Sequence, residues 1–377
     1  METIYLDNAA TTRADPRVVA AMLPYYSEFS GNPSSIHSAG RKAREAVEHA
    51  RMQVAKAISC SPEEIVFTSG GTESDNWAVA SMQQPGAHLI CSAVEHHALL
   101  HSMERAQKNG CELTLLPVDK LGRVHPETLS GALRESTSLV SVMAANNEVG
   151  TIQPVAELCR IAHSHGCLFH TDAVQAFGAM EIRVRDWDVD MMSLSSHKIH
   201  GPKGIGALYL RKETSVHGWM LGGAQERGLR AGTENVPGIV GFGLAAQLAA
   251  EERGTRTARQ KGLRDRLWNG LRNEIPDLQL NGDPADRLPG NLNVFVPGVV
   301  NEALLMRLDL CGICASGGSA CTAGSLDPSH VLLAMGFGPE RAKGSIRFSI
   351  GDDNTEDEID RTVRMMAGLV PQLRSVR

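Results

Sequence analysis

The sequence predicts an α/β protein with a large domain built on a mainly parallel sheet and a smaller α+β domain. The chain has 377 residues, which is too long for one ordinary hydrophobic core and fits two domains. Between residues 65 and 210, short apolar runs alternate with segments of helical periodicity, as in a parallel sheet flanked by helices. From about Gln260 this alternation ends. We therefore expect a large domain of residues 15–255 and a small domain of residues 1–14 and 256–377.

Composition and charge exclude several classes of protein. Hydrophobic residues make up 42% of the chain and charged residues 21%, which is typical of a soluble globular protein. The 37 basic and 43 acidic residues give a net charge of −6 without a basic block, so nucleic-acid and membrane-surface binding are not indicated. The amino terminus lacks a basic region followed by an apolar core, and no segment approaches the roughly 18 apolar residues that span a bilayer.

The cysteines predict a reducing compartment. There are 8 of them, scattered through apolar runs and not spaced as a disulfide framework. Cys311 and Cys314 form a CxxC pair without a second ligand pair nearby, so packing in a core is favoured over zinc binding and no metal site is expected. We expect a cytoplasmic protein with reduced thiols.

The first strand of the large domain leads into a glycine-rich turn. After a short helical stretch at 16–26 and a helix at 41–58, an apolar run at 65–67 ends in TSGGT and a helix begins at Glu73. Free backbone N–H groups and the helix dipole converge at such a turn, so Gly71 and Thr72 are candidates for binding an anion. An ordinary β–α turn has the same pattern.

The next strands each end in polar residues. Strands are expected at 87–91, 113–118, 138–144, 167–170 and 205–210, and helices at 98–109, 126–134 and 155–165. Ligands gather at the carboxyl ends of parallel strands, so the polar residues at these ends should lie along one edge of the sheet. They are Thr72, His96, Asn147, Asp172, Gln175, Ser195, His197 and Lys198.

The segment MMSLSSHKIHGPKGIGALYL presents Lys198 between two strands. Hydroxyls, imidazoles and turn residues surround this lysine, which favours a cleft, although a solvated loop lysine is the alternative for the segment alone. A lysine able to form an imine, Asp172 and an anion site together indicate pyridoxal phosphate. Asp172 would keep the pyridine nitrogen protonated. Each residue alone is equally compatible with a cap, core or surface position, and the combination favours function.

The small domain contains a second informative segment. It is predicted to have a helix at 262–273, strands near 292–296 and 313–315, the loop SGGSACTAGSLDPSH and a strand SIRFSI. Cys321 in this loop has no large apolar neighbour within four residues on either side. A buried structural cysteine is the alternative, but such a composition favours a reactive thiol on a mobile loop.

Ten motifs together resemble those of the cysteine desulfurases, in particular the nitrogen-fixation and iron–sulfur-cluster type. The resemblance covers nearly the whole chain, from Tyr5 to Ile359. The motifs are LDNAATT, GNPSSIHSAG, FTSGGTES, VEHHALL, ANNEVGTIQP, HTDAVQA, SLSSHKIHGPKGIGALYL, RAGTENVP, SGGSACTAGSLDPSHVL and SIRFSIG. The resemblance implies a fold-type I pyridoxal phosphate enzyme. It further implies a homodimer whose active sites both lie at the subunit interface.

The resemblance also implies roles for single residues. Lys198 would be the imine lysine, Asp172 the pyridinium partner, Gln175 the contact to the ring hydroxyl and His96 the stacking residue. The phosphate would be held by Gly71, Thr72, Ser195, His197 and Thr233 of the partner subunit. Asn147 and Arg347 would bind the substrate carboxylate, and Cys321 would be the nucleophile. Gly317 stands where serine is common, and Ser196 stands where glycine is common.

The implied reaction converts L-cysteine to L-alanine and leaves a persulfide on Cys321. Lys198 would remove the α-proton, and His96 would move protons at sulfur. The sulfur would then pass to an acceptor protein, such as a cluster scaffold or a carrier for tRNA thiolation. A selenocysteine lyase or an aminotransferase on the same scaffold is the nearest alternative, and a sulfur carrier that binds the cofactor only structurally is a more distant one.

Overall fold

The computed structural model describes residues 3–318 and 328–375, and its largest sheet has seven strands. In spatial order they are β2 (Ile65–Thr68), β8 (Gly206–Leu210), β7 (Met191–Ser195), β6 (Leu168–Asp172), β5 (Thr137–Ser141), β3 (His88–Ser92) and β4 (Glu112–Leu116). Strand β8 is antiparallel to β2 and β7, whereas the other neighbours are parallel. The predicted class, α/β with a mainly parallel sheet, is confirmed.

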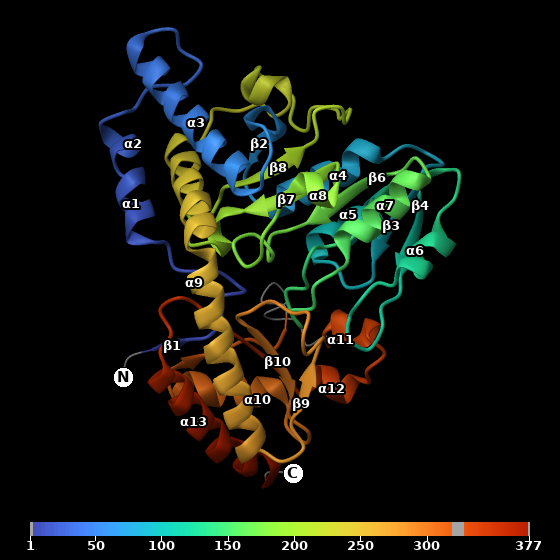
Figure 1. Cartoon of the computed structure of the whole chain (residues 1–377), viewed down its shortest axis with the longest axis vertical. Coiled ribbons are helices and arrows are strands. Elements are labelled where there is room, and N and C mark those ends of the chain that lie inside the picture. Colours follow the sequence, from blue (N-terminus) through green and yellow to red (C-terminus); the bar gives the residue numbers. More distant parts are fainter. Residues whose placement is uncertain (1–2, 319–327, 376–377) are drawn as a thin grey trace.

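Helices cover this sheet in front and behind (Figure 1). The helices of this part are α1 (Pro16–Met22), α2 (Pro24–Ser27), α3 (Ser38–Ala57), α4 (Gly71–Met82), α5 (His97–Lys108), α6 (Pro126–Ala132), α7 (Val155–Ser164), α8 (Val184–Trp187) and α9 (Val236–Glu274). Of these, α1 and α2 lie instead at the side of the sheet and pack against α9 (Figure 1). Short 3-10 turns are η1 (Pro62–Glu64), η2 (Ser196–Lys198) and η3 (Gln225–Gly228). The predicted helices of the large domain agree with these bounds to within a few residues.

Each face of the large sheet has its own hydrophobic core, because successive strand residues point to opposite faces. Val140 and Met192 pack with residues of α3, α7 and α9 on one face. Leu139 and Met191, the preceding residues of the same strands, pack with α4 and α5 on the other. The strands are therefore buried on both faces, as is usual for parallel sheets, and polar groups can gather only at the strand ends.

Helix α9 starts earlier than the sequence predicts. The prediction of a helix confined to 262–273 is wrong, since the observed helix has 39 residues from Val236 to Glu274. Its first half packs closely against α3, where a Cβ on Gly243 would lie 2.6 Å from Cα of Ala50. Glycines at such close contacts weaken the helical signal in the sequence, which is why this half was missed.

The remaining elements form a smaller α+β part. Its strands are β1 (Ile4–Tyr5), β9 (Gln279–Asn281), β10 (Asn291–Phe295), β11 (Ile313–Cys314) and β12 (Ser345–Ser349), and its helices are α10 (Asn301–Leu310), α11 (His330–Ala334), α12 (Pro339–Lys343) and α13 (Glu356–Ser375). Strand β10 lies between β12 and β9 in an antiparallel sheet, and β1 pairs in parallel with β11.

Helix α9 connects the two parts of the chain, and Figure 1 shows it as the long helix that runs along both of them. Ala249 of α9 belongs to a core of the large sheet, whereas Leu263 belongs to the core of the smaller part. Ile4 and Leu6 also belong to the smaller core, so the first residues pack there as expected. No break in α9 marks residue 255, and the predicted domain boundaries stay predictions.

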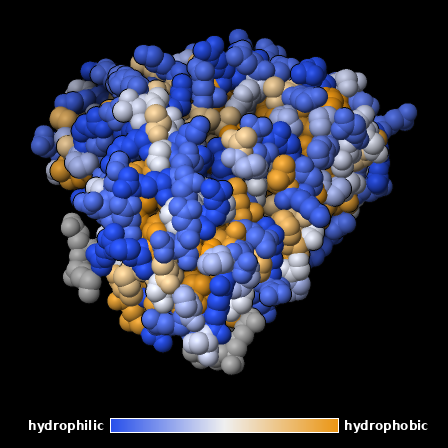
Figure 2. Space-filling model, turned by 60° about the horizontal axis from the view of Figure 1, so that its bottom comes forward, coloured by the Kyte–Doolittle hydropathy of each residue, from blue (hydrophilic) through white to orange (hydrophobic). Residues whose placement is uncertain are grey.

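The surface is mixed in polarity. Hydrophilic residues cover most of the face in Figure 2, with smaller apolar areas between them. Met306 and Leu310 of α10 are among the exposed apolar residues. In the described ranges, no helix is both long enough and apolar enough to cross a membrane.

Candidate active site

Most of the predicted site residues lie along one edge of the large sheet. Strands β3, β5, β6 and β7 are parallel, so their carboxyl ends share that edge. His96 follows β3, Asn147 follows β5, Asp172 ends β6 and Lys198 follows β7. The structure thus places these residues at the edge that the sequence predicts, whereas their chemical roles stay predictions.

The Lys198 side chain meets the N-terminal segment of the chain. Its Nζ donates hydrogen bonds to the carbonyl oxygens of Ala9 at 2.5 Å and Ala10 at 2.7 Å. The side-chain amide of Gln175 donates to the same Ala9 oxygen at 3.0 Å. The predicted pair of Lys198 and Gln175 is therefore brought together by backbone carbonyls that sequence patterns do not reveal.

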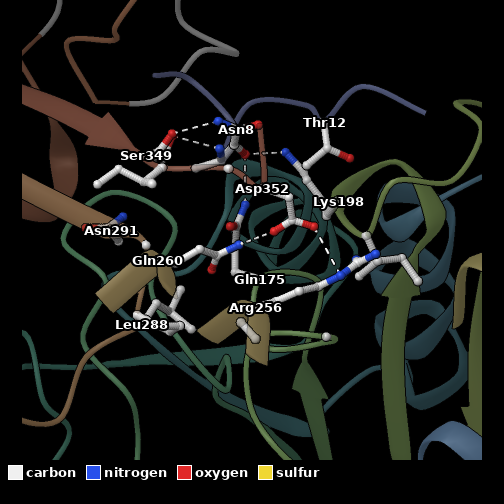
Figure 3. Close-up of a pocket in the computed structure, with 18 of the residues that line it drawn as sticks. Asn8, Thr12, Gln175, Lys198, Arg256, Gln260, Leu288, Asn291, Ser349 and Asp352 are labelled. Atoms are coloured by element: carbon white, nitrogen blue, oxygen red, sulfur yellow. Dashed lines mark hydrogen bonds and ion pairs between the residues drawn. The ribbon is translucent and has the colours of Figure 1, made fainter. Parts of the chain in front are cut away.

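A pocket lies beside Lys198, between the large and small parts of the chain. Its cavity volume is about 100 Å³, and it is open to solvent on one side. Lys198 and Gln175 line it from the large part, and Ser349 and Asp352 line it from the small part (Figure 3). The lysine therefore borders space that a small molecule can enter.

His197 also contacts the N-terminal segment. Its Nδ1 hydrogen-bonds with Oγ1 of Thr11 at 3.1 Å, and its carbonyl accepts from the backbone N–H of Thr12 at 2.9 Å. Burial, with a smaller effect of the Lys198 charge, lowers the pKa of His197 to about 4. The ring is thus neutral at physiological pH and retains one N–H to donate.

Asp172 is a buried carboxylate at the end of β6, with 6% of its surface exposed. Its Oδ1 accepts a hydrogen bond from the backbone N–H of Val174 at 2.8 Å. Burial raises the pKa of Asp172, and the nearby His96 and Lys198 oppose that rise. A cationic group beside this carboxylate would interact with it strongly, because the surroundings are of low polarity.

Two further buried acids lie near Asp172, and the sequence interpretation missed both. Asp75 on α4 lies 3.8 Å from Nε2 of His170, and burial together with the charge of Asp172 raises the pKa of Asp75. Burial raises the pKa of Glu95 to about 8. Both acids therefore retain a proton more readily than an exposed carboxyl does. Only the tertiary fold, which buries them, distinguishes them from surface acids.

The amino end of α4 has no side-chain cap. Gly70 precedes it with φ of 156°, and a Cβ on Gly70 would meet no atom within 4 Å, so the space beside it is open. A Cβ on Gly71 would lie 2.7 Å from Cγ2 of Val174 and 3.9 Å from Cβ of Ser195, so α4 begins close to the end of β7. Thr72 is exposed. An uncapped helix start of this kind attracts an anion.

Arg347 contacts the backbone of Asn147, whereas their predicted binding of a substrate carboxylate stays a prediction. Arg347 on β12 is 1% exposed, and its Nη1 donates to the Asn147 carbonyl oxygen at 2.9 Å. Its Nη2 donates to Oδ1 of Asp7 at 2.8 Å, a contact that the sequence interpretation missed. The Nε has no hydrogen-bond partner within the described residues. This buried guanidinium therefore retains capacity for a carboxylate.

The structure explains both departures from the resembling motifs. Ser196 fits because its neighbour in space is a glycine: a Cβ on Gly201 would lie 2.0 Å from Oγ of Ser196. Gly317 has little free room, since a Cβ there would lie 2.8 Å from Nδ2 of Asn301. Ser196 is thus accommodated by the missing side chain of Gly201, and Gly317 by its own lack of a side chain beside Asn301.

The remaining two predicted residues are Cys321 and Thr233. Cys321 lies outside the described residues. Thr233 is exposed, in the loop between η3 and α9. Its predicted contact with a second subunit is compatible with that exposure and stays a prediction.

Comparisons with known proteins give a consistent result. The family model described as "Aminotransferase class-V" matches residues 4–362. A "Cysteine desulfurase IscS" of Methanosarcina thermophila is 48% identical over 379 aligned residues, which cover 100% of this chain and 94% of the relative. A solved structure described as "NIFS-LIKE PROTEIN" is 39% identical with a TM-score of 0.93, over 98% of this chain and 100% of the other. Another solved structure, "SspA in complex with cysteine", is 34% identical with a TM-score of 0.83, and the match covers 94% of this chain and 100% of the other.

The chain therefore belongs to the class-V aminotransferase family, whose model matches nearly all of it. Within that family it belongs with the cysteine desulfurases of the IscS and NifS-like type. The resemblance of the motifs and the predicted fold are both confirmed.

Proposed function

We propose that this chain is a pyridoxal phosphate-dependent cysteine desulfurase that converts L-cysteine to L-alanine and leaves a persulfide on Cys321. The proposal rests on the N-terminal segment 7–10, which contacts Lys198 through two carbonyls and Arg347 through Asp7. A lysine suited to hold the cofactor and an arginine suited to hold a substrate carboxylate thus border the same short segment. The relatives named above support cysteine as the substrate.

The described residues fit the cofactor. The uncapped start of α4, with Gly71 and Thr72, suits a phosphate group, and the buried Asp172 suits a protonated ring nitrogen. Lys198 borders the pocket and suits covalent attachment. Further contacts would come from Ser195, His197 and Thr233 of the partner subunit to the phosphate, from Gln175 to the ring hydroxyl and from His96 to the ring face.

When bound, pyridoxal phosphate supplies an electron sink for negative charge on the substrate α-carbon. Lys198 would accept the α-proton on Nζ, and Asp172 would hold the ring nitrogen of the cofactor in its protonated form. Arg347 and Asn147 hold the substrate carboxylate and so orient the α-carbon toward Lys198. The neutral ring of His197 donates to the phosphate.

The sulfur step belongs to Cys321. Its thiolate forms a bond with the substrate sulfur while the bond between that sulfur and the substrate Cβ breaks. The electron pair of the broken bond stays with the carbon, and proton transfer there completes L-alanine, with His96 moving protons at sulfur. The oxidation states balance within this exchange, so no external oxidant or reductant is consumed.

The proposal includes a homodimer with shared active sites and a cytoplasmic location. The exposed position of Thr233 supports a contact with a second subunit. The terminal sulfur of a persulfide is open to attack by an acceptor thiol, so the sulfur would pass to an acceptor protein, such as an iron–sulfur cluster scaffold or a carrier for tRNA thiolation.

A product assay tests this function. We expect the protein to form equal amounts of L-alanine and sulfide from L-cysteine with a reductant and without any keto acid. Lys198→Ala should abolish both products and the visible absorbance of the bound cofactor, because attachment and proton transfer both need Nζ. An aminotransferase would form no alanine without a keto acid, and a selenocysteine lyase would form it from selenocysteine alone. Either result, or alanine from the Lys198→Ala variant, would contradict the proposal.

A further inference from the structure

Glu148 is a buried acid that the proposed chemistry does not use. It follows Asn147 in the turn after β5 and is 1% exposed. The Ser329 hydroxyl donates to its Oε2 at 2.5 Å, whereas its Oε1 has no hydrogen-bond partner in the described part of the chain. Burying a carboxyl group with one oxygen unpaired is costly, so its retention calls for a structural or functional reason.

The same carboxyl group lies beside both ends of the segment that contains Cys321. Gly318 is the last described residue before residues 319–327, and a Cβ on Gly318 would lie 2.8 Å from Oε2 of Glu148. Its φ of 139° also favours glycine there. Ser329 is the second residue after the segment and donates to that same oxygen. One carboxylate oxygen is therefore the meeting point of the two flanks.

The backbone of Glu148 is held firmly. Its N–H donates to Oδ1 of Asn146 at 2.9 Å, and its carbonyl accepts from the side-chain amides of Asn291 at 3.3 Å and Asn293 at 3.0 Å. Val331 and Leu332 of α11 pack in one cluster with Val149, the next residue. The Glu148 carboxyl group therefore extends from a rigid base.

The flank at Gly318 is also tied to the substrate side of the site. Ser316 and Arg347 exchange backbone hydrogen bonds at 2.6 and 3.1 Å, and the Ser316 hydroxyl donates to the Gly318 carbonyl at 3.2 Å. Arg347 in turn donates to the carbonyl of Asn147, the residue before Glu148. Hydrogen bonds thus connect Arg347 with Gly318 on one side and with Asn147, the neighbour of Glu148, on the other.

We propose that Glu148 is a positioning residue for Cys321, which fixes both flanks of the segment that carries the thiol relative to Asn147 and Arg347. This inference rests on the proposed function, since it takes Cys321 as the sulfur acceptor. Small errors in the distance between a nucleophile and its target slow a reaction severely. Loss of the carboxyl group should therefore slow sulfur transfer to Cys321 more than it weakens binding of L-cysteine.

Single-turnover kinetics test this role in the enzyme loaded with cofactor. The persulfide on Cys321 is measured over time by rapid quenching, alkylation and mass spectrometry. Binding of L-cysteine is measured by the change in cofactor absorbance. In Glu148→Ala we expect persulfide formation to slow by about tenfold or more, with half-saturation by L-cysteine changed by less than about twofold. Ser329→Ala should act in the same direction to a smaller extent. Glu148→Gln, which keeps an oxygen to accept from Ser329, should restore most of the rate.

Glu64 offers a matched control. It is a second glutamate that is 1% exposed, and it lies at the end of η1. Its Oε2 accepts a hydrogen bond from the Arg185 guanidinium at 2.6 Å. Glu64→Ala should lower the thermal unfolding midpoint without slowing persulfide formation.

Three outcomes would decide against the proposal in distinguishable ways. Wild-type persulfide rates in both Glu148→Ala and Ser329→Ala would overturn the positioning role alone. Equal losses of persulfide formation and L-cysteine binding would replace it by a general structural role. Absence of any persulfide on Cys321 in the wild-type protein would instead refute the proposed function.

Discussion

Ser196 shows how a residue beside the site lysine is accommodated by its neighbours. Its Oγ is buried and has no hydrogen-bond partner among residues 3–318 and 328–375. A Cβ on Gly201 would lie 2.0 Å from that oxygen and 3.1 Å from Cβ of Ala245. Gly201 therefore provides the room that the Ser196 side chain requires. Ser196 is only two residues before Lys198.

Replacing Gly201 tests this complementarity. Gly201→Ala should lower the free energy of unfolding by about 1–3 kcal/mol, because the added methyl group overlaps the Ser196 hydroxyl. Adding Ser196→Gly should recover part of the loss, since a contact of 2.9 Å to the Ser196 carbonyl oxygen would remain. Chemical denaturation measures both effects. Gly131→Ala is the control, because a Cβ on Gly131 meets no atom within 4 Å. Equal stabilities of the Gly201→Ala and Gly131→Ala variants would refute the explanation.

At the level of secondary structure, His170 connects three adjacent strands beneath the site. It lies on β6 and is fully buried. Its Nδ1 hydrogen-bonds with Ser141 of β5 at 2.8 Å, and its Nε2 with Ser193 of β7 at 2.9 Å. Burial lowers the pKa of His170 from 6.5 to about 3. Between these two pH values the His170 ring is therefore neutral in the folded chain but protonated in the unfolded chain.

This difference predicts a dependence of stability on pH. The contribution of His170 is complete above pH 6.5 and is lost as pH falls toward 3, because only the unfolded chain then gains the proton. The loss should be about 1.4 kcal/mol per pH unit in this range. In His170→Asn, the slope of unfolding free energy against pH should become shallower by this amount, as measured by denaturation at several pH values above the onset of acid unfolding. An unchanged slope would show that His170 is not the group responsible.

On the scale of the whole molecule, the proposed site is assembled from segments distant in sequence. Asp172 ends strand β6 of the large sheet, Lys198 lies in η2 directly after β7, and Arg347 lies in the smaller part. The N-terminal segment contacts both Lys198 and Arg347. Helix α9 runs without a break along both parts and packs in a core of each. The relative placement of lysine and arginine therefore depends on the complete chain.

This arrangement explains what the sequence could predict. Alternating apolar runs identify the parallel strands, and polar residues at their ends, such as Asp172 and Lys198, follow from strand direction alone. The approach of Ala9 to Lys198 and the burial of Asp75 and Glu148 depend on contacts between distant segments, which no local pattern records. The early start of α9 was missed for a related reason, since its glycines are explained only by α3 packed against them.

The central claim is that Lys198 supports a reaction whose sulfur product is formed on Cys321. Its most direct test is mass spectrometry of the protein after brief exposure to L-cysteine without reductant. The account predicts that the peptide containing Cys321 gains the mass of one sulfur atom, that the other cysteines do not, and that Cys321→Ser keeps the cofactor absorbance yet gains no sulfur. Sulfur on a different cysteine, or full desulfuration by the Cys321→Ser variant, would contradict the account.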